Sequence, residues 1–299
     1  MRINPVREDQ ATPETRRIYD AIKEALHLPH TPLFFQFLGG FPEYLEYISG
    51  GIIANLSDSR FNAVIQTRNE FVRDIFKEDF DRGKDVVDFL QRYKNTPEFY
   101  YFEKDVQSLY AVNASLAFIF ISLREAVKGW AVAARKLAAK VESRKSKVES
   151  EGEKMEEELV YGIDIITDHG SRIADQVEFS GKDEERSDER RGLTVKTQGL
   201  IKREGSQISV ALLPEYLRLC RNEFSELLKA QQLLFLRVEL ERVVLRSIDT
   251  LPYKIESPIN VVLELTKMYP TFPDLLYLLS EHFPTYAMQR WLFSAYLLP

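Results

Sequence analysis

The sequence predicts an all-α protein built from two tandem helical repeats. Phe41–Leu45 (Phe-Pro-Glu-Tyr-Leu) returns further along the chain as Leu213–Leu217 (Leu-Pro-Glu-Tyr-Leu), and Tyr110–Asn113 is echoed by Tyr286–Gln289. The two echoes keep their order, and their displacements along the chain are nearly equal, which indicates two copies of one structural unit. No segment shows the sustained alternation of apolar and polar residues that predicts β-strands, so both copies are expected to be helical.

Composition excludes several classes of function. The 299 residues, 44% of them hydrophobic, are enough for two ordinary domains with a sizeable core. A net charge of -6 disfavours nonspecific binding to nucleic acid or to an anionic membrane. Cys220 is the only cysteine, and no two of the four histidines have a metal-binding spacing. With no glycine-rich phosphate loop either, neither a metal nor another cofactor is expected.

The location expected from the sequence is cytoplasmic, without a membrane partner. Residues 1–10 are polar and lack the apolar region of a signal peptide. Leu109–Leu123 is the most apolar stretch, but it contains Asn113 and Ser115 and is short for a membrane span. We therefore expect it to be a buried helix. The sequence leaves a homo-oligomer open.

The first repeat is assigned to residues 1–140. Thr12 followed by Pro13 and Glu14 is a helix-start pattern, and an apolar stripe at helical spacing follows it. Apolar spacing and proline positions predict further helices over 33–38, from 42 onward, and over 59–76, 86–93, 110–127 and 130–137.

Residues 141–192 are interpreted as a charged connector between the repeats. More than half of the side chains between Val141 and Val160 are charged, and residues 182–191 are almost all charged. Charge runs of this kind are typical of solvated segments. The second repeat is assigned to residues 193–299, with helices expected over 214–228, 231–248, 259–268, 272–279 and 286–298.

Four short motifs give the chain a resemblance to a known family. They are Phe41-Pro42 with Tyr44-Leu45, Tyr110-Ala111 with Asn113, Gln198 through Arg203, and Gln289-Arg290-Trp291. Together they resemble the group I 2-haloacid dehalogenases, in which two helical repeats of one chain form a pseudo-dimer. The resemblance implies a pocket for a small organic acid between the repeats, and hydrolysis by water that an aspartate activates and an asparagine orients.

The positions that match the family's functional residues depart from its pattern. The catalytic aspartate falls on Ser206, whose neutral hydroxyl cannot replace a carboxylate as base, although Glu204 lies nearby. The water-orienting asparagine falls on Leu116, one helical turn from Asn113. Pocket aromatic positions fall on His30 and Leu33 in the first repeat, and on Met288 in the second. Hydrolytic dehalogenation by the family mechanism is therefore not expected.

Polar residues near these positions have a structural interpretation beside the functional one. His30 could contact an anionic ligand, or it could be a surface histidine between Pro29 and Pro32. Asn113 and Gln289 occupy matching places in apolar helices, where buried amides need hydrogen-bond partners. They could bond to each other across the repeat interface or present hydrogen bonds to a ligand.

The sequence therefore supports two classes of function. The first is a diverged relative of the dehalogenases that binds a small organic acid through His30, Asn113, Leu116, Met288 and Gln289, with Glu204 or Ser206 as the candidates for any surviving hydrolysis. The second is a helical interaction scaffold without a small-molecule site, because the aromatic side chains (19 Phe, 14 Tyr and 2 Trp) could fill the core completely.

Overall fold

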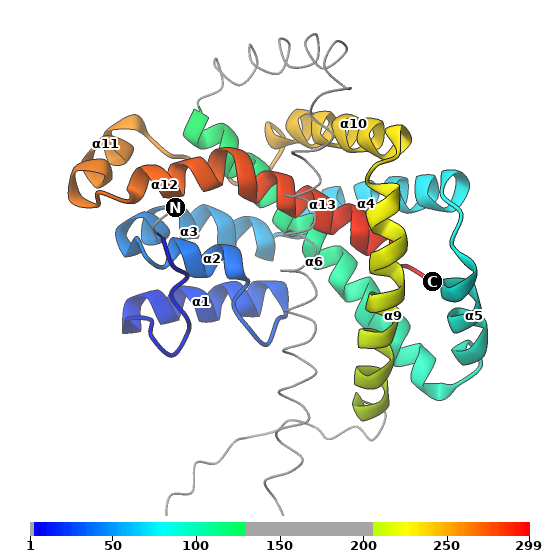
Figure 1. Cartoon of the computed structure of the whole chain (residues 1–299). Helices are drawn as coiled ribbons and strands as arrows, with labels where there is room; N and C mark the ends of the chain where they lie inside the picture. Colours follow the sequence, from blue (N-terminus) through cyan, green and yellow to red (C-terminus); the bar gives the residue numbers. More distant parts are fainter. Residues whose placement is uncertain (1–2, 129–205) are drawn as a thin grey trace, which may run out of the picture.

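A computed structural model describes residues 3–128 and 206–299, and within these two ranges every regular element is a helix (Figure 1). The predicted all-α class is confirmed for this part of the chain. The connector and Glu204 lie outside the described residues, as does the helix expected over 130–137.

The helices of the first range follow the predicted start signals. They are α1 (Pro13–Leu26), α2 (Leu33–Leu38), α3 (Pro42–Ser57), α4 (Ser59–Asp79), α5 (Lys84–Tyr93) and α6 (Pro97–Lys128). The Thr12 side chain accepts a hydrogen bond from the Thr15 backbone N–H at 3.2 Å, and Asp58 caps α4 in the same way through Arg60. The helix expected to begin near Tyr110 is instead the second half of α6, which runs unbroken over 32 residues from Pro97.

The helices of the second range begin earlier than expected at two places. They are α9 (Ser206–Leu227), α10 (Gln231–Ile248), α11 (Ile259–Met268), α12 (Phe272–Tyr277), η2 (Leu278–His282) and α13 (Phe283–Tyr296). Pro214 lies inside α9 rather than at its start. A proline lacks only its own backbone donor and can bend a helix without ending it. The second place is α13, which begins at Phe283 directly after the π-helical turn η2. Pro284 therefore lies in the first turn of α13 rather than before the helix.

Helix α6 forms the centre of the fold. Every residue from Val112 to Leu123 is buried, so this part of α6 is covered on all sides, as expected for the most apolar stretch of the sequence. Its longest contact is with α13, and α4, α9, α10 and η2 pack around it. By length and composition α6 could also cross a membrane, but 78% of its most apolar window is buried by the other helices.

Hydrogen bonds join the two described ranges into one body. The Asn55 side chain in α3 donates to the carbonyl of Tyr253 at 2.6 Å and accepts from the Tyr253 backbone N–H at 3.1 Å. Nearby, the hydroxyls of Tyr44 and Ser257 lie 3.0 Å apart. Asn55 is fully buried, so its side chain, in place of water, supplies the hydrogen bonds of the backbone in the loop before α11.

Asn55→Ala is expected to lower the free energy of unfolding by about 2–3 kcal/mol, because it removes both hydrogen bonds to the Tyr253 backbone and empties a fully buried position. Urea unfolding followed by circular dichroism measures this change. Asn62→Ala, at an exposed position of α4, is the matched control and should change the stability by less than about 0.5 kcal/mol. Equal stability of the two variants would contradict the role assigned to Asn55.

Cys220 is expected to be unreactive in the folded protein. The side chain is fully buried in α9, and burial raises the pKa of its thiol to about 12. Because the thiolate is the reactive form, a thiol reagent such as Ellman's reagent at pH 8 should label Cys220 only after the protein unfolds. Stoichiometric labelling within seconds in native buffer would show that α9 does not cover this residue.

Candidate functional site

Four of the predicted site residues meet on one pair of helices. Asn113 and Leu116 belong to α6, whereas Met288 and Gln289 belong to α13. All four side chains are buried, and α6 and α13 form the most extensive helix contact in the described part of the chain. Leu116 and Met288 are apolar and are 1% and 2% exposed, so their contribution is to the packing of this contact.

The other predicted residues lie elsewhere. His30 is exposed in the loop between α1 and α2, so it is not part of the buried layer, and Leu33 is only half-buried. The neighbouring Thr31 has no exposed surface. Ser206 is the first residue of α9, and its candidate partner Glu204 lies outside the described residues.

The ring contacts fix the register between α6 and α13. Phe120 and Phe283 lie 5.6 Å apart between ring centroids, and Lys128 at the end of α6 pairs with Glu281 just before α13, so the helices run antiparallel. Asn113 lies seven residues before Phe120, and Arg290 lies seven residues after Phe283. Seven residues are two helical turns, or about 10.5 Å, on nearly the same helix face. Asn113 and Arg290 are therefore at the same level of the contact.

Arg290 is a cation without a carboxylate partner among the described side chains. The side chain as a whole is half-buried, but its Nε is buried and has no hydrogen-bond partner, and its guanidinium lies 5.7 Å from the centre of the Phe34 ring in α2. Burial lowers the pKa of Arg290 to about 10. The ring gives the charge some stabilisation, but the Nε–H, which water does not reach, still requires a hydrogen-bond acceptor.

A second unpaired polar atom occurs on α6, at the level of Arg290. The side-chain oxygen of Asn113 is buried and has no hydrogen-bond partner. Thr31, which stands two residues before α2 and three before Phe34, is by contrast bonded to the Glu8 carboxylate, and although burial raises the pKa of Glu8, this interaction lowers it. The Thr31 backbone N–H is bonded to a Glu8 carboxylate oxygen at 2.6 Å, which holds this loop in place. Buried polar atoms are rarely left unsatisfied, so the Arg290 Nε and the Asn113 oxygen mark a candidate ligand site.

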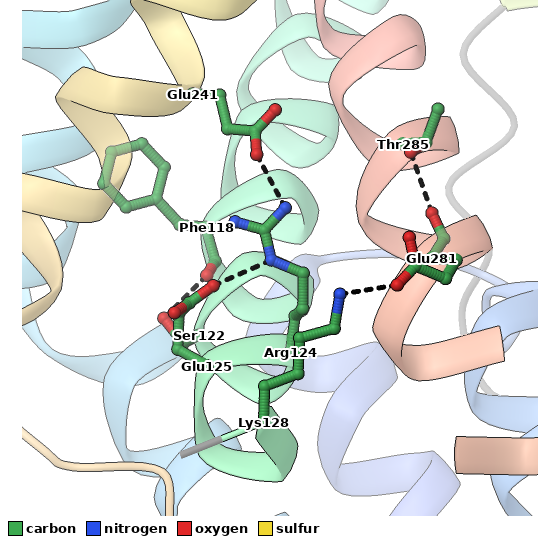
Figure 2. A network of polar contacts seen from close by, with 8 residues as sticks. All are labelled: Phe118, Ser122, Arg124, Glu125, Lys128, Glu241, Glu281 and Thr285. Carbon is green, nitrogen blue, oxygen red and sulfur yellow. Dashed lines mark hydrogen bonds and ion pairs between the residues drawn. The ribbon is translucent and has the colours of Figure 1, made fainter. Parts of the chain in front are cut away.

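The charged groups at the other end of α6 have carboxylate partners, in contrast to Arg290. Figure 2 shows Arg124 between two carboxylates, with Nε 2.8 Å from Glu125 and Nη1 2.7 Å from Glu241 of α10. Lys128 contacts Glu281 at 2.6 Å in the same view. Burial disfavours the Arg124 charge, but Glu241 and Glu125 outweigh this effect and raise the pKa of Arg124. This network holds α6, α10 and η2 together.

Sequence reasoning missed Arg290 as a site residue. It appeared only within the Gln-Arg-Trp motif, although a signal was present. The positions one turn away on α13 hold no acidic residue; they are Tyr286, Ala287, Phe293 and Ser294. An arginine in an apolar helix without an acidic neighbour one turn away must find its anion elsewhere.

No protein-family model, no curated protein and no solved structure matches this chain. The function is therefore inferred from the chain's own residues and their geometry.

The two arginines should respond oppositely to replacement by methionine. Arg124→Met leaves Glu125, only 2% exposed, without its partner and is expected to cost about 3–5 kcal/mol of stability. Arg290→Met removes an unpaired charge from an apolar helix contact, so the stability should stay the same or increase. Urea unfolding of both variants measures this difference. A loss for Arg290→Met as large as that for Arg124→Met would show that Arg290 has a structural partner.

The effect of Arg290→Met should not depend on pH between 6 and 9. The pKa of Arg290 is about 10 in the folded chain, below its ordinary value of 12.5. Folding therefore carries the cost of the charged form at every pH below about 10, and this cost falls only as the pH rises above 10. Unfolding curves of the wild type and the variant at pH 6 and pH 9 should differ by the same amount. A difference that changes across this range would point to another titrating group beside Arg290.

Proposed function

We propose that this protein is a duplicated helical protein that binds a small organic acid at the α6–α13 contact, between its two halves. The observation that carries the proposal is the Arg290 guanidinium, which lacks a carboxylate partner among the described side chains. A carboxylate is the anion whose planar geometry an arginine matches with two parallel hydrogen bonds.

The order of the helices supports the duplication. After the repeated Pro-Glu-Tyr-Leu motif, α4, α5 and α6 of the first half correspond in order to α10, α11 and α12 of the second. The corresponding helices begin at Ser59 and Gln231, at Lys84 and Ile259, and at Pro97 and Phe272. These three displacements along the chain nearly equal one another and those of the sequence echoes. In this correspondence the long α6 matches α12, η2 and α13 together.

Reciprocal contacts support a two-fold-like arrangement of the halves. Tyr44, from the first copy of the motif, packs on Phe272 of the second half at 5.2 Å between centroids. Tyr216, from the second copy, packs on Phe102 of the first half at 5.0 Å. Likewise α4 contacts α13, and α10 contacts α6. A two-fold relation generates such pairs of equivalent contacts.

This arrangement supports placing the ligand beside Arg290. In a two-fold arrangement, corresponding residues of α6 and α13, such as Asn113 and Gln289, lie opposite each other near the middle of the antiparallel pair. Asn113 and Arg290 lie at this level. The Arg290 guanidinium would hold the ligand carboxylate, and the Asn113 oxygen would accept a hydrogen bond from a donor group elsewhere on the ligand. The Phe34 ring would pack against a small apolar body. The buried surroundings favour a ligand of a few carbon atoms.

Calorimetric titration with propionate tests the proposal. The wild type should bind propionate and not propionamide, the neutral analogue of the same shape. Arg290→Met should weaken propionate binding by at least about tenfold, because a charge-assisted hydrogen bond contributes about 1.5–3 kcal/mol. Arg290→Lys, which keeps the charge but not the planar fork, should fall between the two.

Arg60→Met is the matched control, since Arg60 is exposed and pairs with Asp58 at 2.8 Å on the surface of α4. It should leave propionate binding unchanged. Equal binding of propionate and propionamide, or unchanged binding by Arg290→Met, would contradict the proposal.

Halide release from both enantiomers of 2-chloropropionate tests for a surviving reaction. We expect binding without turnover, because Ser206 stands where the resembling family has its catalytic aspartate. If halide is released, a different base acts, and Glu204→Gln is the variant that examines it.

A helical interaction scaffold remains the second proposal. Exposed aromatic side chains favour it, notably Tyr100 at 65% and Phe235 at 62%. Failure of every carboxylate to bind would favour this function over the first.

A further inference from the structure

A second candidate site lies at the far end of α13. A cavity of about 260 Å³ opens between the last residues of α4, the loop that follows α4, and the C-terminal end of α13. It is separate from the Arg290 layer, since its α13 residues are Ala295 and Tyr296, more than one turn beyond Arg290. A volume of this size accommodates a molecule with a single ring.

Cations outnumber carboxylates by one in the lining of this cavity, although the whole chain has a net charge of -6. Arg73, Lys77 and Arg82 contribute these cations, against the carboxylates of Asp81 and of the last residue, Pro299. Arg73 pairs with its neighbour Asp74 at 3.1 Å. Lys77 and Arg82 make no ion pair with any side chain in the described ranges. Two cations are therefore free to meet an anion at the cavity.

Aromatic rings form the apolar part of the cavity wall. The Phe76 and Phe80 rings contact each other at 4.9 Å between centroids, and Phe76 also contacts the Tyr296 ring at 6.4 Å. All three side chains are buried by the surrounding helices. Such a wall favours the flat face of a ring over a fully hydrated ion.

The Glu223 carboxylate, which lies behind the aromatic wall, connects the wall to the loop after α4 through two hydrogen bonds. Glu223 of α9 accepts hydrogen bonds from the Tyr296 hydroxyl and, at 2.9 Å, from the Gly83 backbone N–H. Burial, together with the bond to Glu223, raises the pKa of Tyr296, so the hydroxyl remains a donor at neutral pH. The backbone next to Arg82 is thereby fixed to α13. A preformed site loses less entropy when it binds a ligand.

Gly83 has a specific role in this arrangement. A methyl group at this position would lie 2.2 Å from a carboxylate oxygen of Glu223, so an alanine would require this carboxylate, which accepts both hydrogen bonds, to move. The lack of a side chain at residue 83 therefore leaves room for the contact between the loop and α13.

We propose that this cavity binds a small single-ring organic anion, with its carboxylate or phosphate group held by Arg82 and Lys77 and its ring against Phe76 and Phe80. The proposal does not rest on the function proposed for Arg290, because no residue is shared between the two sites.

Fluorine NMR with 4-fluorobenzoate tests the proposal. The titration uses the Arg290→Met variant, so that failure of one site cannot be mistaken for failure of the other. We expect saturable broadening of the 4-fluorobenzoate signal and none for neutral 4-fluorobenzamide. Phenyl phosphate and benzoate should both displace the probe, and the stronger of the two identifies the preferred anionic group. Equal binding of the amide, or displacement by inorganic phosphate as effective as that by phenyl phosphate, would overturn the proposal.

Variants of the cavity complete the test. Arg82→Met and Lys77→Met should each weaken 4-fluorobenzoate binding about tenfold, whereas Arg60→Met, at an exposed arginine outside the cavity, should not change it. Gly83→Ala should weaken binding although it removes no ligand contact. Unchanged binding in both charge variants, with the fold confirmed by circular dichroism, would contradict the assignment.

Discussion

The antiparallel contact between α6 and α13 is the feature on which the other helices depend. Every residue of α6 from Val112 to Leu123 is buried, and α13 covers this stretch along the longest helix contact of the described chain. Phe34, Phe120 and Phe283 interlock where α2 meets this pair. Because a helix that is apolar on all sides has no stable exposed face, the surrounding helices must pack around α6. The two described ranges thus share one core.

The ends and the middle of this contact differ in their electrostatics. At the end of α6, Arg124 and Lys128 are matched by carboxylates from other helices, which compensates for taking charges out of water. In the middle, Arg290 and the Asn113 oxygen are not matched by described side chains. A buried Nε without an acceptor lowers stability at this level of the contact. Local groups that reduce stability are typical of binding sites, which supports a ligand at this level.

Sequence patterns predicted the helices well where the signals were local. Thr12 and Asp58 marked helix starts through their capping side chains, and the apolar run after Leu109 predicted a buried helix. They were less reliable at prolines. Pro214 lies within α9 because tertiary packing tolerates a missing backbone donor, which no local rule reports. For the candidate site, the sequence brought Asn113 and Gln289 forward but not Arg290, whose importance depends on partners that are distant in sequence.

By itself the sequence determined the helical class, the buried character of α6 and the two echoes between the halves of the chain, since periodicity and repetition are properties of the chain. Only the tertiary structure decided which polar groups are paired. Arg124 and Arg290 both lie in largely apolar helices, yet Glu241 reaches one and no described carboxylate reaches the other. The difference arises because such ion pairs form between helices that are far apart in the sequence, where helical spacing carries no information.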